Sequence, residues 1–337
     1  MMRVIGWDVG GANVKAAHVA REREARSVRV TSRPFEIWRN KESLPAVLRA
    51  VAADLPPADA TAVTMTAELS DAFRTKREGV GFVLDAVGLV AQGAPAVFTT
   101  DGEFVDVATA RARPLDVAAS NWMATARLVA RHASDAILVD VGSTTADVVP
   151  IRVGRVVAQG RTDPERLLAG EMVYTGALRT NVAAIVPRVP LWGGECPVSA
   201  ELFAVSGDAH VLLGNLGPDD YTCATPDGRP PTPTFAAERL ARVVCADVEM
   251  LGRDEIVGIA RAVAEAQVRQ IAAALSRVAA RLERPAEVIV TGQGAFLAHR
   301  AAAECGLSSR DLSDVLGAEV GSAAPAVAVA WLLAEEG

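Results

Sequence analysis

The stretch ILVDVGSTTADVVPI, residues 137–151, places acidic and hydroxyl side chains between two apolar runs. The first run ends at Asp140, the turn reads Gly142-Ser143-Thr144-Thr145, and the second run begins around Asp147. A glycine-rich turn after a strand exposes backbone N–H groups, and the hydroxyls add donors, which together favour phosphate. Carboxylates repel phosphate, so the two acids make sense where Mg²⁺ lies between them and the phosphate. The stretch therefore predicts a turn that binds phosphate and a divalent cation.

A second stretch with the same layout, VIGWDVGGANVKAAHV, occupies residues 4–19. Its apolar runs are separated by Asp8, Gly10, Gly11, Asn13 and Lys15. Each stretch opens a series of three predicted strands, the first series at about 3–7, 14–20 and 27–31. An ordinary glycine-rich hairpin would explain one such turn. Two matched turns, each opening a matched series of strands, favour a shared ligand-binding purpose.

The bulk composition limits the function classes. The chain has 337 residues, half of them hydrophobic and 22% charged, with a net charge of −7, so we expect about two well-packed domains. The acidic balance argues against nucleic-acid and anionic-membrane partners. We find no membrane-length apolar run, no signal-peptide pattern and no C-x-x-C spacing, and therefore expect a cytoplasmic protein with free thiols. Whether it forms a homo-oligomer is left open.

Alternating strands and helices predict an α/β chain in two parts. We expect an N-terminal domain over 1–133, with strands at 60–66 and 94–100 and helices at 42–55, about 80–91 and 115–132. A C-terminal domain over 134–337 contains a loop-rich insertion at about 175–250, which is long enough to suggest a function of its own. After it we expect one long helix or a helix pair at 253–283, a strand at 286–292 and a last helix at about 322–335.

A third polar stretch, MTAELSDAFRTKREGV at residues 65–80, follows the predicted strand 60–66. Arg74 and Lys76 are suited to binding a diphosphate or a carboxylate. Glu68 or Asp71 is suited to act as a base or to hold a cation, and the residues leave that choice open. Arg77 and Glu78 are better explained as solvated charges at the start of the next helix.

The order of these motifs resembles the superfamily of actin, sugar kinases and heat-shock chaperone ATPases. That resemblance implies two ribonuclease-H-like domains facing a central cleft. It assigns 8–15 and 140–147 to two phosphate motifs and 288–297, with Gly292 and Gly294, to an adenosine motif. It also implies that Asp8, Asp140 and Asp147 support Mg²⁺, directly or through water.

Within that superfamily the chain resembles the hydantoinase A/oxoprolinase-like family, in the branch of tetrahydromethanopterin-linked one-carbon-pathway proteins. The resemblance is carried by ELSDAFRTKREGV, DVGSTTADVVPI, GEMVYTGALRT and YTCATPDG. It implies a transferase of methanofuran-type cofactor biosynthesis that condenses an aminomethylfuran-methyl diphosphate with the phenol of an acceptor and releases pyrophosphate. Whether the phenolic amine is derived from tyramine or tyrosine is left open. The resemblance implies catalytic roles for Asp8, Glu68, Asp71, Arg74, Lys76 and Asp140.

Two other function classes remain. An ATP-dependent small-molecule kinase or oxoprolinase-like ATPase would use the same turns, although ATP is the less favoured ligand. A non-catalytic ATP-binding regulator of the DNA-binding kind is disfavoured by the acidic charge and by the lack of a helix-turn-helix segment.

Overall fold

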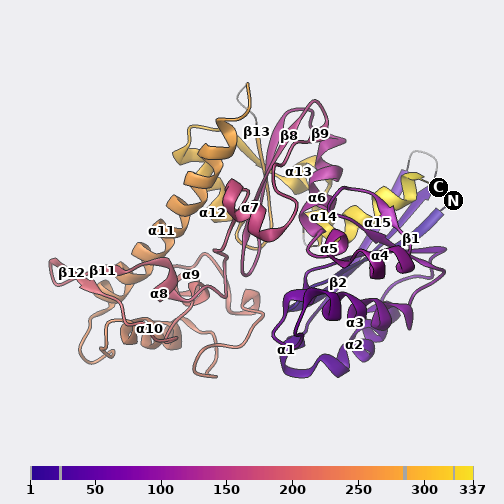
Figure 1. Cartoon of the computed structure of the whole chain (residues 1–337). Helices are drawn as coiled ribbons and strands as arrows, with labels where there is room; N and C mark the ends of the chain where they lie inside the picture. The colour runs from indigo at the N-terminus through magenta and orange to yellow at the C-terminus, as the bar shows by residue number, and fades with distance from the viewer. Residues whose placement is uncertain (1, 23–24, 284–286, 322, 337) are drawn as a thin grey trace. The chain divides into compact units, whose positions relative to one another are not determined.

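The computed structural model describes residues 2–22, 25–283, 287–321 and 323–336. Its first sheet has six strands in the order β3-β2-β1-β4-β5-β6, of which β1 and β2 are labelled in Figure 1. Strand β1 pairs antiparallel with β2 and parallel with β4. The strands are β1 Met2–Val9, β2 Asn13–Glu22, β3 Ala25–Pro34, β4 Ala60–Met65, β5 Pro95–Phe98 and β6 Phe104–Val105.

Helices pack against this sheet because successive side chains of each strand point to opposite faces. Ile5, Trp7 and Val9 of β1 share a buried core with α2 (Leu44–Ala53) and α3 (Lys76–Gly88). The alternate residues include Gly6, where an added Cβ would lie 2.1 Å from the carbonyl oxygen of Ala326. This close approach lets α15 (Ala324–Glu336) lie directly on β1, β2 and β4.

The second sheet repeats the plan of the first around a strand pair that carries the other turn. Its order is β10-β8-β7-β13-β14, and β9 pairs with β8. The strands are β7 Ala136–Val141, β8 Ala146–Arg152, β9 Arg155–Val156, β10 Met172–Val173, β13 Glu287–Thr291 and β14 Ser309–Asp311. Ala286, at the start of the predicted strand 286–292, lies outside the described residues. Two mixed sheets of matching order are the architecture that two ribonuclease-H-like domains require.

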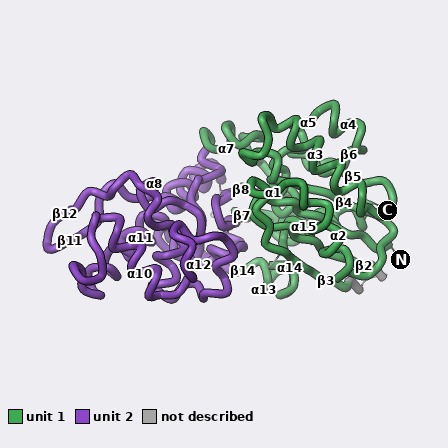
Figure 2. The backbone as a smooth tube through the Cα atoms, turned by 90° about the horizontal axis from the view of Figure 1, so that it is seen from below, with its two compact units in different colours: residues 1–138, 149–169, 311–337 green, residues 139–148, 170–310 purple. Residues whose placement is uncertain are grey.

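The chain forms two compact units, shown in green and purple in Figure 2. Unit 1 comprises 1–138, 149–169 and 311–337, and unit 2 comprises 139–148 and 170–310. Both units are therefore built from separated stretches of chain. The sequence boundary at 133/134 remains a prediction.

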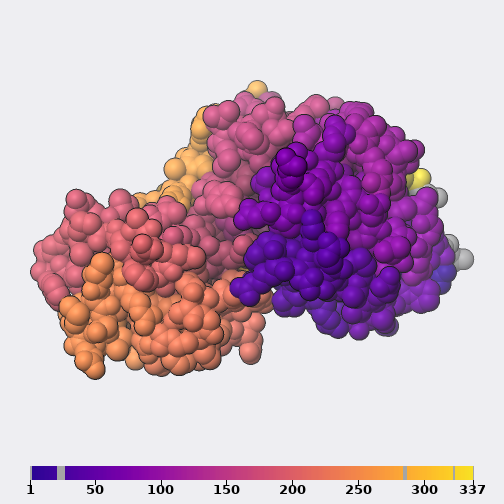
Figure 3. Space-filling model, turned by 60° about the horizontal axis from the view of Figure 1, so that its bottom comes forward, coloured from indigo at the N-terminus to yellow at the C-terminus, as the bar shows by residue number. Residues whose placement is uncertain are grey.

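The predicted insertion contains short helices and one hairpin between its loops. It contains α8 (Val182–Ile185), the hairpin β11 (Arg188–Leu191) and β12 (Gly194–Pro197), α9 (Ser206–Leu212) and α10 (Pro233–Arg242). Apolar residues of these elements pack together with those of α11, Arg253–Ala279, and the atoms of this stretch gather in the pink to orange part of Figure 3.

The interior of the insertion is partly ionic. Asp208 and Arg239 pair at 2.7 Å with fully buried side chains.

Two predicted helices differ clearly from those observed. The helix expected at 115–132 is two helices, α5 (Pro114–Val117) and α6 (Asn121–Ala130), because Ala119 between them adopts a left-handed φ of 51°. Helix α3 begins earlier than expected because the Thr75 hydroxyl caps it by accepting a bond from the Glu78 N–H. The long helix at 253–283 is one helix, α11, ending at Ala279. The last helix is preceded by α14 (Ala318–Gly321), and residue 322 lies outside the described part.

The remaining short elements are α1 Ile37–Asn40, η1 Lys41–Ser43, η2 Ala67–Leu69, α4 Val107–Ala112, α7 Asp163–Ala169, η3 Pro218–Asp220, α12 Ala295–Glu304 and α13 Leu312–Leu316. Within the described ranges, none of the helices combines the length and apolar character needed to cross a bilayer.

Candidate functional site

The first turn joins β1 to β2 in unit 1 and positions Asp8 beside Lys15. The two residues are register partners on the antiparallel strands. On the other side, Asp8 is the register partner of Thr64, whose hydroxyl lies 2.9 Å from that of Ser120. The Gly10 N–H donates to the Asn13 carbonyl at 3.0 Å. An added Cβ at Gly10 would lie 2.8 Å from that carbonyl oxygen, so this tight turn excludes a side chain. Gly11 completes it, and its Cβ direction is nearly open.

The carboxylate of Asp8 is buried, and a bound cation would compensate its negative charge. Its side chain is 9% exposed, and Oδ1 is buried with no hydrogen-bond partner. Burial raises the pKa of Asp8 to about 6, although the positive charge of Lys15 opposes the rise. An orphaned carboxylate oxygen beside a glycine-rich turn is a fitting ligand for Mg²⁺, which is commonly held by one or two carboxylates, waters and phosphate oxygens. The described residues contain no group of three or more His, Cys, Asp or Glu side chains placed to hold a metal ion.

The second turn, in unit 2, follows Asp140 at the end of β7. The Gly142 N–H donates to the Thr145 carbonyl at 2.9 Å and closes the turn. The hydroxyls of Ser143 and Thr144 lie 3.4 Å apart, and all four turn residues, Gly142 to Thr145, are half-buried. The predicted donors are thus gathered at a partly open position. Asp147, which is 8% exposed, lies in β8 opposite Met172.

The third glycine motif packs against the second turn. Gly292 has a φ of +90°, and a Cβ there would lie 2.4 Å from Asp140 Oδ1. The Gly294 N–H donates to the Val141 carbonyl at 2.8 Å. The hydroxyl of Thr291, at the end of β13, is buried with no partner. The structure thus brings Asp140, the 142–145 turn and Gly292–Gly294 together.

The 65–80 stretch contributes a buried ion cluster in unit 1. Glu68 lies in η2, directly after β4, and is 1% exposed. Its Oε1 lies 3.5 Å from Lys76 Nζ, which lies 2.8 Å from Asp163 Oδ2 at the start of α7. Burial raises the pKa of Glu68 to about 7, because the positive charge of Lys76 offsets only part of the desolvation. Perturbed carboxyls of this kind are typical of acid–base sites.

Two other members of this stretch are exposed. Asp71 and Arg74 face solvent, and their side chains form no ion pair or hydrogen bond with the described residues. The backbone N–H of Arg74 donates to Glu78 Oε2 at 3.0 Å, which together with the Thr75 cap fixes the start of α3. Arg77 donates to the Arg111 carbonyl at 3.3 Å. Of the two predicted anion-binding cations, Arg74 is therefore available, whereas Lys76 is engaged by two carboxylates.

Two charged residues beside these motifs were not identified from the sequence. Asp163 is 87 positions from its partner Lys76. Arg179 is 35 positions from Thr144, whose Oγ1 lies 3.4 Å from its NH1. The only signal that favoured Arg179 was its place in GEMVYTGALRT, a segment singled out for its resemblance.

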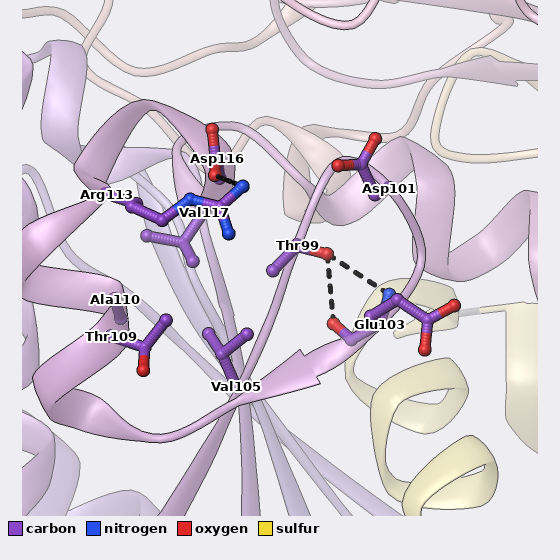
Figure 4. A pocket seen from close by; sticks show the side chains of 9 residues that line it. All are labelled: Thr99, Asp101, Glu103, Val105, Thr109, Ala110, Arg113, Asp116 and Val117. Atoms are coloured by element: carbon purple, nitrogen blue, oxygen red, sulfur yellow. Dashed lines mark hydrogen bonds and ion pairs between the residues drawn. The ribbon is translucent and has the colours of Figure 1, made fainter.

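Unit 1 also has a cavity that is not lined by the predicted site residues. It has a volume of about 100 Å³ and is lined by Thr99, Asp101, Glu103, Val105, Thr109, Ala110, Arg113, Asp116 and Val117 (Figure 4). Among its lining residues, the Thr99 hydroxyl hydrogen-bonds to the backbone of Glu103, and Arg113 forms an ion pair with Asp116. None of the predicted site residues lines it.

Comparison with known proteins identifies relatives over nearly the whole chain. One, from Methanocaldococcus jannaschii, is 35% identical over 334 residues, covering 99% of this chain and 98% of the relative. A second, from Methanococcus vannielii, is 31% identical over 204 residues, covering 59% of this chain and 91% of the relative. Both are named "(4-{4-[2-(gamma-L-glutamylamino)ethyl]phenoxymethyl}furan-2-yl)methanamine synthase".

Structural and family comparisons agree with this. A nucleotide-free structure of acetone carboxylase superposes with a TM-score of 0.50 at 12% identity, covering 91% of this chain and 67% of that one, a likeness of fold alone. The α/β fold of the actin, sugar-kinase and chaperone-ATPase superfamily is confirmed. The hydantoinase/oxoprolinase family model matches residues 59–336. The chain therefore belongs to the hydantoinase/oxoprolinase family.

Proposed function

We propose that this enzyme forms an aryl ether between a phenolic amine and a furan-methyl group. The observation that carries the proposal is the relative that is 35% identical over 99% of the chain and is named as a synthase of a phenoxymethyl-furan methanamine. That product contains an O–CH₂ link between a phenol and a furan. Making the link requires a leaving group on the furan-methyl carbon and a base for the phenol proton.

We propose a diphosphate as the leaving group. The bond from the furan-methyl carbon to the diphosphate oxygen breaks, and its electron pair leaves with pyrophosphate. The phenol oxygen forms the new bond to the same carbon, and its proton passes to a base. The electron-rich furan stabilises positive charge on the carbon, so the main task of the protein is to stabilise the departing anion.

The turn residues suit that task. The hydroxyls and N–H groups of residues 142–145 and the Gly10–Lys15 turn supply donors for phosphoryl oxygens. Arg74, exposed and unpaired among the described residues, is suited to pair with the diphosphate or with the acceptor's carboxylate. Bound Mg²⁺ would offset the diphosphate charge, and the carboxylates suited to hold it are Asp8 in unit 1 and Asp140 and Asp147 in unit 2.

For the base we favour Glu68 over Asp71. A base is most effective when its pKa lies near the working pH, and burial raises the pKa of Glu68 to about 7. Lys76 and Asp163 then act by positioning: the ammonium between the two carboxylates fixes Glu68 and balances part of its charge.

The second candidate is an ATP-dependent kinase or oxoprolinase-like ATPase. The packing of the Gly292–Gly294 motif against Asp140 favours it, because the resemblance assigns that motif to adenosine. One assay separates the two. The protein is incubated with Mg²⁺, a furan-methyl diphosphate and γ-glutamyl-tyramine, with or without ATP, and ether, pyrophosphate and ADP are quantified.

Ether and pyrophosphate formed one for one without ATP support the transferase. Strict dependence on ATP, with ADP as the phosphorus product, refutes it. Arg74→Ala should lower the condensation rate roughly 30- to 1,000-fold, the effect of losing one charge-assisted contact that strengthens in the transition state. Arg77→Ala is the matched control. Among the described residues the Arg77 side chain hydrogen-bonds to a backbone carbonyl of its own unit, so this change should leave the rate unchanged.

A further inference from the structure

The second turn contains no positively charged side chain. The stretch 139–148 contains two aspartates and no lysine or arginine, whereas the first turn includes Lys15. A diphosphate brought to the second turn meets those carboxylates, and backbone N–H groups and hydroxyls carry only partial charges. A positive side chain at this turn therefore comes from a segment other than 139–148.

Residues 176–180 are hydrogen-bonded to the second turn and packed closely against it. The Ala177 N–H donates to the Gly142 carbonyl at 2.9 Å, and the Leu178 and Arg179 N–H groups both donate to the Ser143 carbonyl, at 3.0 and 2.9 Å. Gly176 lies so close that an added Cβ would be 2.4 Å from the Thr144 nitrogen. The backbone of Arg179 therefore has a fixed position relative to the turn.

The guanidinium of Arg179 reaches the hydroxyls. Its NH1 lies 3.4 Å from Thr144 Oγ1, and the side chain is half-buried. Five N–H groups in a planar fork allow an arginine to keep a hydroxyl contact while it binds phosphoryl oxygens.

Buried, uncharged side chains form a hydrogen-bond network with the backbone of residues 176–180. The Gly176 carbonyl accepts from Ser206 Oγ and from Gln267 Nε2, each at 2.8 Å. Gln267 Oε1 accepts from His210 Nε2 at 2.9 Å. Burial lowers the pKa of His210 to about 4, so the ring is neutral near pH 7. Because these supports carry no charge, Arg179 supplies the positive charge of this segment.

We propose that Arg179 is a phosphate-binding residue of the second turn, where its guanidinium contacts the phosphoryl oxygens of a diphosphate group. The proposal deepens the proposed function and rests on it for the source of that group, the furan-methyl diphosphate. A nucleotide would present the same diphosphate chemistry, so the test uses both sources.

The test measures binding of inorganic pyrophosphate and of ADP, each with Mg²⁺, by titration calorimetry. The proteins are wild type, Arg179→Ala, Arg179→Gln and Arg179→Lys. Glutamine keeps a hydrogen-bond donor without the charge, and lysine keeps the charge without the fork. Arg188→Ala is the control, because Arg188 is an exposed arginine of the same unit that donates to the Glu195 carbonyl. Thermal melts verify that each variant is folded.

We expect Arg179→Ala and Arg179→Gln to weaken pyrophosphate binding roughly 10- to 100-fold, Arg179→Lys to weaken it less, and the control to match wild type. Equal affinity in all folded variants, or no binding of either probe to wild type, overturns the proposal. If only ADP binding depends on Arg179 and no ether forms, the arginine assignment stands and the proposed function fails. If ether forms and pyrophosphate binds without regard to Arg179, the assignment fails and the function stands.

Discussion

Replacing Glu68 by glutamine tests whether burial raises the pKa of the Glu68 carboxyl. The ordinary pKa of a glutamate is 4.5, and burial raises that of Glu68 to about 7. Between these values the folded protein binds more protons than the unfolded chain, so the stability of the wild type falls as the pH rises through this window. Raising the pKa from 4.5 to about 7 corresponds to about 3 kcal/mol at full ionisation. Glutamine cannot ionise, so this loss should be absent in Glu68→Gln.

The assay is urea unfolding of both proteins at intervals from pH 4 to pH 8. The difference in unfolding free energy, variant minus wild type, should increase by about 3 kcal/mol across that range. Parallel stability curves would refute the reasoning, because they would mean that Glu68 is not perturbed by burial. If Glu68 is also the base, kcat/KM for condensation should rise as the pH passes about 7, and this dependence should disappear in the variant.

Two further changes test the turns. Asp8→Asn should lower Mg²⁺-dependent turnover roughly 100-fold or more. The melting temperature above pH 6 should stay unchanged or rise, because the substitution removes a buried carboxylate with a raised pKa. Wild-type turnover in the variant would contradict the magnesium role. Gly176→Ala should cost roughly 1–3 kcal/mol of stability, because its Cβ would lie 2.4 Å from a backbone nitrogen. Gly258→Ala, in an open position of α11, should be neutral or stabilising by about 1 kcal/mol, and an equal loss in both variants would argue against the close packing at Gly176.

The sequence predicted the parts of the fold that depend on local pattern. The turns after Asp8 and Asp140 lie at the ends of β1 and β7 as expected, and each opens a strand pair. Strand alternation and glycine spacing are local signals, and they are strong where a turn must be tight. The close packing of Gly292 on Asp140 was not predicted from the sequence; the structure shows that an added Cβ at Gly292 would lie 2.4 Å from Asp140 Oδ1.

What the sequence could not supply are contacts between distant segments. Asp163 and Arg179 attract no notice in their own neighbourhoods, and each gains its place from a partner that folding brings near. The left-handed φ of Ala119, between α5 and α6, is likewise not signalled by the sequence, because alanine is a good helix former.

The seating of α15 on β1 has a consequence for synthesis of the protein. The strands of the first sheet are among the earliest parts of the chain to be made, whereas the helix that covers Gly6 and buries its own Ala326, Val327 and Ala330 is the last element described. At about 5–20 residues per second, a ribosome needs roughly 13 to 52 seconds to pass from Met65 to Ala324. During that time one apolar face of the sheet has no permanent cover. Nascent chains should therefore depend on chaperones, and premature termination upstream of Ala324 should yield aggregates rather than a folded first unit.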